Sequence, residues 1–186
     1  MKDDSILIRR VLKGDPQAFR ELVKAHERLV YHMVSRLIDR EEEREDLCQE
    51  IFLKVYRNLS RFKHESQLST WIGSIAYKTT INHLRKHKKY QETGLETVSA
   101  QWESLEISAE QFVDRNYVHK YVHQLIEQLP QQYKVVLTLY HLQEMSYTEI
   151  GEISGMPEGT VKNYLFRARK LLKEKLETVF RKEELL

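Results

Sequence analysis

The sequence predicts an all-α protein made of two small helical domains joined by a flexible acidic linker, with a helix-turn-helix in the second domain. Apolar residues recur at steps of three and four along most of the chain, and no convincing set of alternating β-strand runs is present. Residues 91–114 break this periodicity and carry about six acids but no Lys or Arg. We therefore expect domains at 1–90 and 112–186 and a linker at 91–111. A solvated tether and an active role for this linker are equally open.

Residues 5–13 form the first expected helix, and Gly14 ends it. Asp15 followed by Pro16 is typical of the next helix start, because an Asp side chain caps free backbone N–H groups and proline fits the first helical position. This second helix presents one apolar face. Its members are Phe19, Leu22, Val23, His26, Val30, Met33, Val34 and Leu37.

Two further helices complete the first domain. The first of them, over roughly 43–58, overlaps an acidic segment at 39–50 that holds about seven acids against two arginines. It should bury Leu47, Ile51, Phe52 and Val55. The other helix is capped by Ser69 or Thr70 and should run to about Lys88. Its core side is expected at Trp71, Ile75, Thr79 and Leu84.

Helical spacing resumes at Phe112 in the second domain. The residues in register there are Val118, Val122, Leu125 and Leu129. Pro130 either ends this helix or starts the next, because proline breaks a helix interior but is accepted in the first turn. The segment 131–143 is strongly apolar and should be buried.

A helix-turn-helix is expected from Ser146 to about Arg181. Ser146 with Glu149 three residues later is the pattern of a capping box, Gly155 makes the turn, and Pro157 opens the last helix. The shared core should consist of Ile150, Ile153, Met156, Val161 and Leu165. The side chains expected to point away from it are those of Thr160, Lys162, Asn163, Phe166 and Arg167.

Two properties of the last helix suit DNA binding. Lys, Asn and Arg near the start of a second helix can hydrogen-bond base edges in the major groove. The formal charge from residue 157 to residue 182 is about +5, which suits phosphate contacts. The alternative is an amphipathic terminal helix with a solvated basic face.

Residues 61–90 suit single-stranded nucleic acid. Their formal charge is about +6, with Glu65 as the only acid. The aromatic side chains interleaved with this charge are Phe62, Trp71, Tyr77 and Tyr90. Unpaired bases stack on such rings while cations follow the phosphates. The spacing of Trp71 to Ile75 nevertheless favours a core position for this tryptophan.

Four motifs resemble those of extracytoplasmic function (ECF) sigma factors, the small two-domain proteins that direct bacterial RNA polymerase to promoters. In order they are GDPQAFRELV, EDLCQEIFLKVYRNLSRF, LSTWIGSIAYKTTINHLRK and LPQQYKVVLTLYHLQEMSYTEIGEISGMPEGTVKNYLFRARKLL. The resemblance covers roughly 8–90 and 112–178. It implies binding of core RNA polymerase and promoter-specific initiation, with a duplex −35 element and a melted −10 element both being read.

The resemblance also implies three sets of site residues. Docking on the clamp helices of the polymerase β′ subunit is expected at Asp46, Leu47, Gln49, Glu50 and Lys54. The −10 strand is expected at Phe62, Lys63, Trp71, Lys78, Asn82, Arg85 and Lys86. The −35 duplex is expected at Thr160, Lys162, Asn163, Phe166, Arg167 and Lys170.

Further partners and departures follow from the same resemblance. Residues around 129–142 should pack the second domain, part of which docks on the polymerase β flap, and the linker should lie in the polymerase channel. An anti-sigma protein is implied as a partner. The family often has Asn at the position of Lys78 and Asp at that of Asn82, so these two residues bear on the −10 base preference.

Two other classes of protein compete with this interpretation. A stand-alone helix-turn-helix regulator with an N-terminal ligand or dimer domain would bind DNA without polymerase. An adaptor whose basic helices bind an acidic partner would show no promoter preference. Both leave unexplained why one chain carries the acidic helix and the aromatic, basic segment together.

The remaining signals favour no cofactor, metal or catalysis. His83 and His87, like His119 and His123, have helical spacing for a metal but no third ligand beside them. Glycine-rich nucleotide motifs and a nucleophile elbow are missing, so an enzyme is not expected. The single cysteine, Cys48, is expected to be buried and inert, and it fits a reducing cytoplasm. We see no signal peptide and no apolar run of roughly 18 residues, so membrane insertion is not expected.

Overall fold

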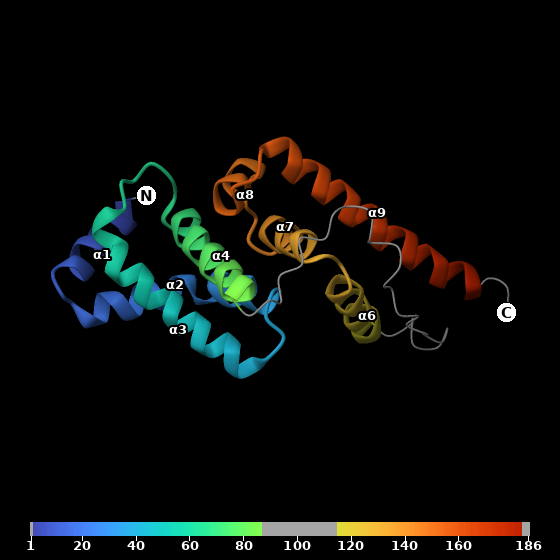
Figure 1. The fold of residues 1–186 in the computed structure, drawn as a ribbon, viewed down its shortest axis with the longest axis horizontal. Coiled ribbons are helices and arrows are strands. Elements are labelled where there is room, and N and C mark those ends of the chain that lie inside the picture. Colours follow the sequence, from blue (N-terminus) through green and yellow to red (C-terminus); the bar gives the residue numbers. More distant parts are fainter. Residues whose placement is uncertain (1, 87–114, 184–186) are drawn as a thin grey trace.

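A computed structural model of the chain describes residues 2–86 and 115–183 (Figure 1). The first half contains four α-helices and one short 3₁₀ helix within the described residues. They are α1 (Lys2–Leu12), α2 (Pro16–Ser35), α3 (Glu41–Asn58), η1 (Leu59–Arg61) and α4 (Leu68–Lys86). The predicted linker at 91–111 lies outside the described residues.

The second half contains four helices within the described residues. They are α6 (Arg115–Glu127), α7 (Gln131–His141), α8 (Tyr147–Ser154) and α9 (Glu158–Glu183). The all-α prediction is confirmed, since residues 2–86 and 115–183 contain no strand. In Figure 1 the first half is blue to green, and α8, in orange, lies beside the green helix α4.

Local capping residues set two of the predicted helix starts. The carboxylate of Asp15 accepts hydrogen bonds from the backbone N–H groups of Gln17 at 2.9 Å and Ala18 at 3.2 Å, and Pro16 is the first residue of α2. At α8, the N–H of Glu149 donates to Ser146 Oγ at 3.2 Å, while the N–H of Ser146 donates to Glu149 Oε2 at 2.9 Å. This reciprocal pair is the predicted capping box.

Asp15 gives the chain a pH-dependent helix start. Hydrogen bonds from the N–H of Ala18 and from Arg10 lower the pKa of Asp15 below its ordinary value. A depressed pKa contributes stability above the unfolded-state pKa of about 4, and this stability is lost as pH falls through the folded-state pKa. We expect Asp15→Asn, which still caps but does not titrate, to reduce the acid sensitivity of the unfolding free energy. Urea denaturation at about pH 7 and about pH 3 measures this, and equal acid sensitivity in both proteins would contradict it.

The predicted start of α4 at Ser69 or Thr70 is wrong. The N–H of Trp71 donates to the carbonyl of Gln67 at 3.0 Å, which closes the first turn of the helix. Ser69 and Thr70 therefore lie inside this turn and not before it. Leu68 is 2% exposed, and its burial extends the helix two or three residues further toward the N-terminus than a capping pattern indicates. Other bounds differ by two or three residues: α1 begins at Lys2, α3 begins at Glu41, and α9 ends at Glu183.

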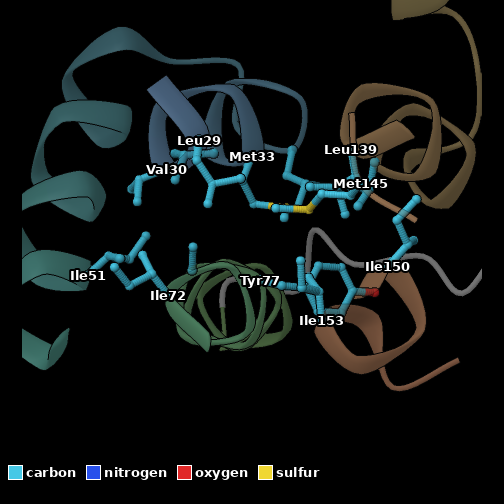
Figure 2. Packing of buried hydrophobic residues seen from close by; sticks show 14 of the residues in the cluster. Leu29, Val30, Met33, Ile51, Ile72, Tyr77, Leu139, Met145, Ile150 and Ile153 are labelled. Carbon is cyan, nitrogen blue, oxygen red and sulfur yellow. The ribbon is translucent and has the colours of Figure 1, made fainter. Parts of the chain in front are cut away.

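The buried apolar side chains of both halves belong to one cluster (Figure 2). Helix α4 makes the largest contact between the halves, because it packs against α2 and α3 on one side and against α8 on another, and α2 adds a smaller contact with α7. The buried side of α4 is therefore wider than predicted and is centred on other residues. Trp71 and Ile75, which were expected in the core, are only half-buried, whereas Ile72 and Ala76 are fully buried.

The registers of α2 and α6 also differ from the expected ones. Leu29 is buried in α2, while Val23 is half-buried. In α6, Tyr121 and Leu125 are buried and Val122 is half-buried. The predicted burial of residues 131–143 is confirmed for Tyr133 and for residues 135–139, whereas His141 and Leu142 at the end of the segment are exposed.

Candidate nucleic-acid interface

The helix-turn-helix is assembled as its sequence predicts. Ile150, Ile153, Val161 and Leu165 are at most 1% exposed, and Met156 packs against them from the turn. Gly155 has a φ of 74°, a left-handed conformation that an L side chain rarely adopts. The chain therefore turns sharply between α8 and α9, and the first turns of α9 lie beside α8 (Figure 1).

The predicted −35 residues lie on the outer side of α9. Lys162, Asn163, Phe166 and Lys170 are exposed, and Thr160 and Arg167 are half-buried. Phe166 is 66% exposed, which is unusual for a large apolar side chain and leaves its ring available to a partner. Lys162 Nζ lies 2.7 Å from Glu158 Oε1, and this hydrogen bond raises the pKa of Lys162. Because all six side chains are exposed or half-buried and lie on the outer side of α9, a partner can reach them from one side of the helix.

A cluster of aromatic and basic side chains beside α9 has no signal in the sequence. The rings of Tyr140 and Tyr147 are stacked with centroids 5.2 Å apart. The Arg169 guanidinium lies 5.0 Å from the Tyr140 ring centroid, and Lys162 Nζ lies 5.3 Å from that of Tyr147. Three helices contribute to these contacts, so only the folded chain brings them together. The cluster holds two cations at the edge of the helix-turn-helix.

Four of the predicted −10 residues form one stripe along α4. Trp71, Lys78, Asn82 and Arg85 are separated by seven, four and three positions, which places them on one helical face. Lys78, Asn82 and Arg85 are exposed there, as is Lys86 to one side of the stripe.

The aromatic part of the −10 set lies at the start of this stripe. Trp71 is half-buried, and its ring centroid lies 5.3 Å from that of Phe62, which is itself 4.6 Å from that of His64. Lys63 is exposed between them. The sequence offered a core position and a base-stacking position for Trp71. The half-buried ring is compatible with both, because one part packs on the core and another part remains accessible.

Three of the five predicted docking residues, Asp46, Gln49 and Glu50, are exposed on α3. Lys54 is half-buried, with Nζ 2.7 Å from Glu50 Oε1 and 3.4 Å from Thr79 Oγ1. Leu47 does not belong with this face, because it is 2% exposed and sits in the core.

Leu53, and not Leu47, is the leucine exposed beside the predicted docking residues of α3. Leu53 is 52% exposed and lies seven positions after Asp46, on the same face of α3. Its sequence signal is that it falls between Ile51 and Val55, out of phase with the buried positions. We call Asp46, Gln49, Glu50 and Leu53 the α3 face.

Cys48 and the histidines, which were considered for redox chemistry and metal binding, do not form such a site within the described residues. Cys48 is half-buried rather than buried, and burial together with the nearby Glu45 carboxylate raises its pKa to about 11. His83 Nε2 lies 3.6 Å from Glu43 Oε2. In the part of the chain that the structure describes, no three His, Cys, Asp or Glu side chains come together as metal ligands. His87 and His119 lie outside the residues whose side chains are described.

None of the described helices combines the length and the apolar character needed to cross a membrane.

Known families match both halves of the chain. Sigma-70 region 2 matches residues 22–90, and Sigma-70, region 4 matches residues 119–172. The ECF RNA polymerase sigma factor SigW of Bacillus subtilis (strain 168) is 33% identical over 176 residues, covering 91% of this chain and 94% of SigW. Regions 2 and 4 are the parts from which sigma-70-type initiation factors are built, so the chain is a promoter-recognising sigma factor.

Within that class the chain belongs to the ECF sigma factor family. Two solved structures share the fold. CnrH, in complex with the cytosolic domain of CnrY, has a TM-score of 0.65 and 18% identity, covering 93% of this chain and 96% of CnrH. The sigma factor RpoE of Bartonella quintana, in complex with the anti-sigma factor NepR, has a TM-score of 0.59 and 21% identity, covering 86% of this chain and 96% of RpoE.

Proposed function

We propose that the three surfaces divide the work of promoter recognition. The exposed side of α9 reads the duplex −35 element, the α4 stripe with Phe62 and Lys63 captures the melted −10 strand, and the α3 face docks on the β′ clamp helices of core polymerase. The observation that carries this proposal is the exposed set Lys162, Asn163 and Phe166 on the second helix of a helix-turn-helix, within a region 4 match.

Recognition at −35 follows from the donors and acceptors on α9. Arg167 and Lys162 can donate to guanine O6 and N7, and Asn163 can pair with adenine N6 and N7. Phe166 supplies an apolar contact of the kind that a thymine methyl group accepts. Lys170, one turn further on, is placed for a phosphate rather than a base. In this proposal the Tyr140–Tyr147 cluster holds Arg169 at the edge of the same DNA surface.

Recognition at −10 uses stacking and charge. A base that leaves the duplex loses its stacking partner, and an aromatic ring such as Trp71 or Phe62 replaces it. Lys78 and Arg85 then follow the phosphates of the single strand. Asn82 is the neutral hydrogen-bonding side chain of this stripe and is our candidate for contact with a base edge. Because the family often has other residues at Lys78 and Asn82, we expect a −10 preference that differs from that of relatives.

Docking on polymerase is proposed to combine charge with one apolar contact. Two carboxylates surround Leu53 on the α3 face, and such a rim of charge around an apolar centre suits a protein interface. Part of the second half, near residues 129–142, is proposed to dock on the β flap. Leu142 is 53% exposed at the end of this segment.

Reversing charge on the α3 face should weaken the polymerase complex. We expect Glu50→Lys to reduce the affinity for core polymerase about tenfold, because it places a cation where the partner complements an anion and also removes the Glu50–Lys54 pair. Glu41→Lys makes the same change of charge nine positions earlier, about 180° around the helix from Glu50 and outside the α3 face, and serves as the control. Fluorescence anisotropy of the labelled sigma factor with purified core polymerase measures both. Equal losses in the two variants would contradict a specific face.

A regulator and a cellular setting complete the proposal. RpoE of Bartonella quintana assembles with an anti-sigma factor, and we propose that a protein of this kind binds the present chain. The sigma factor itself performs no catalysis, since the polymerase carries out nucleotidyl transfer. The cytoplasm, where polymerase works, is the proposed location.

Run-off transcription with purified core polymerase on a genomic promoter library tests the whole proposal. We expect new, defined start sites that appear only with this protein and share upstream −35 and −10 elements. Absence of such starts, together with no stable complex with core polymerase, would leave a stand-alone helix-turn-helix regulator as the better explanation.

A further inference from the structure

Glu158 lies at the start of α9 beside the predicted −35 residues, although it is not one of them. It is the first residue of the helix and precedes Lys162 by four positions, so the two side chains lie along the same edge of the first two turns. In a helix-turn-helix, the N-terminal part of the second helix contacts base edges. The charged residues of the predicted −35 set, Lys162, Arg167 and Lys170, are all cations. A carboxylate among them repels phosphates, so it lowers affinity for any DNA unless a base edge offers it a donor.

Two contacts fix the Glu158 carboxylate. Its Oε1 lies 2.7 Å from Lys162 Nζ, and the hydroxyl of Thr148, at the start of α8, donates to its Oε2 at 3.2 Å. The hydrogen bond from Lys162 and the charge of Lys162 lower the pKa of Glu158, so at neutral pH this group is ionised and only accepts hydrogen bonds. A carboxylate has about four acceptor sites. The two contacts therefore leave acceptor sites for a partner, and the side chain is 48% exposed.

Lys162 is held from a second direction. Its Nζ lies 5.3 Å from the ring centroid of Tyr147, a cation–π contact with α8. An ammonium group has three donors, and the ion pair with Glu158 uses one of them. Through Thr148 and Tyr147, the first helix of the helix-turn-helix thus orients both members of the Glu158–Lys162 pair. Groups that are ordered before binding lose less conformational freedom when a partner arrives.

The Glu158–Lys162 pair matches the middle of a G·C base pair viewed from the major groove. There guanine O6 accepts and cytosine N4 donates. These two base atoms are hydrogen-bonded to each other at about 2.9 Å. Because Nζ and Oε1 of the pair are 2.7 Å apart, Lys162 can donate to O6 while Glu158 accepts from N4, and the ion pair stays intact. Guanine N7, next to O6, is a second acceptor for the ammonium group.

Other base pairs match the Glu158–Lys162 pair less well. On an A·T pair, a carboxylate that accepts from adenine N6 lies beside adenine N7, an acceptor that repels it. The ammonium group then lies on thymine O4 beside the thymine methyl group, where a second acceptor is missing. A reversed C·G pair sets the carboxylate against guanine O6 and the ammonium group against cytosine N4. The pair therefore discriminates by repulsion as well as by attraction.

A second ion pair on α9 shows what the Glu158–Lys162 pair adds. Lys173 and Glu177 are also four positions apart, with Nζ 3.6 Å from Oε1. The Glu177 side chain is 48% exposed, the same as that of Glu158, but it lies beyond the predicted −35 residues. Glu158 differs in its shorter distance to lysine and in its hydrogen bond from α8.

We propose that the Glu158–Lys162 pair determines sequence specificity by selecting one G·C base pair of the −35 duplex through guanine O6 and cytosine N4. This inference rests on the proposed reading of that duplex by α9, and it adds a carboxylate to the reading residues. Because the pair carries no net charge, it contributes sequence preference with little gain in nonspecific affinity. Removal of the carboxylate should therefore abolish preference at one position and strengthen binding to unrelated DNA.

Binding of a panel of duplexes by Glu158→Gln tests the proposal. The parent duplex carries the −35 element shared by the start sites that run-off transcription defines, and the panel places all four base pairs at each position in turn. Fluorescence anisotropy with the full chain at constant salt measures each affinity. We expect the unmodified chain to prefer G·C at one position by at least about fivefold, and Glu158→Gln to prefer it there by less than about twofold. Affinity of this variant for a scrambled duplex should rise severalfold.

Two further variants make the result specific. Lys162→Ala should lose preference at the same position as Glu158→Gln. Glu177→Gln makes the same chemical change in the matched ion pair, at an equally exposed side chain, and should keep the preference at every position.

Two results would overturn the proposal. One is an unchanged preference in Glu158→Gln, with affinities for all duplexes altered alike, which is the behaviour of an ordinary surface ion pair. The other is loss of preference at a position that Lys162→Ala does not affect. If the unmodified chain binds the −35 duplex and the scrambled duplex equally well, the proposed reading by α9 itself fails, independently of Glu158.

Discussion

Replacing Arg167 with alanine should weaken binding of a −35 duplex by about 1–3 kcal/mol, a factor of roughly 5 to 150 in the dissociation constant, because a guanidinium that donates twice to one guanine is lost. Arg167 lies on the exposed side of α9, one position after Phe166. Loss of a base contact should also relax sequence preference at one position of the element, whereas loss of a phosphate contact weakens all sequences alike. Binding to the −35 duplex and to a scrambled duplex should therefore be measured together.

Lys173→Ala is the matched control for this change. Lys173 also lies on α9 and carries the same charge, but its Nζ is 3.6 Å from Glu177 Oε1 and its side chain is 75% exposed, beyond the proposed reading residues. We expect it to lower the affinity for both duplexes by a small and equal factor. If Arg167→Ala behaves in the same way, Arg167 contacts the backbone and the reading set has to be redrawn.

Replacing Leu22 with alanine should reduce the free energy of unfolding by about 2–5 kcal/mol, because it removes buried methyl groups and leaves a cavity. Leu22 is fully buried in α2, the helix that packs against α1, α3 and α4. Urea denaturation followed by circular dichroism measures the change. In a Trp102→Phe background, which leaves Trp71 as the single tryptophan, fluorescence of this half-buried ring gives a second signal from the first half of the molecule.

Leu12→Ala offers the same chemical change at an exposed position. Leu12 is the last residue of α1 and is 52% exposed, so we expect an effect within about 0.5 kcal/mol. Similar losses from the two substitutions would contradict the assignment of Leu22 to the core. A loss in Leu22→Ala that appears only in Trp71 fluorescence would show that the two halves unfold separately.

Features that depend on a few neighbouring residues could be predicted from the sequence. The Asp15 cap and the Ser146–Glu149 box rest on side chains within three positions of the backbone they stabilise, and the turn at Gly155 rests on the left-handed backbone of that one residue. The buried and exposed sides of α9 followed from helical spacing alone, since this helix packs on its own domain along a single stripe.

Features that depend on contact between distant segments could not be predicted from the sequence. Leu68 starts α4 early because of burial, and the sequence pattern of Ser69 and Thr70 pointed to a cap instead. Thr70 is buried because Glu149, far along the chain, accepts its hydrogen bond at 3.3 Å. Leu47 is in helical phase with Ile51 and Val55, and Leu53 is not, so spacing indicated which of the two leucines is buried, but it gave no indication that the exposed Leu53 joins the docking face.

The burial of Met33, Met145 and Ile153 has a consequence for the chain before it meets polymerase. Each is almost fully covered in the structure, and separation of α8 from α4 would leave apolar side chains facing water. Such surfaces on a free protein favour aggregation and capture by chaperones and proteases. Contact between the two halves therefore keeps these side chains away from water.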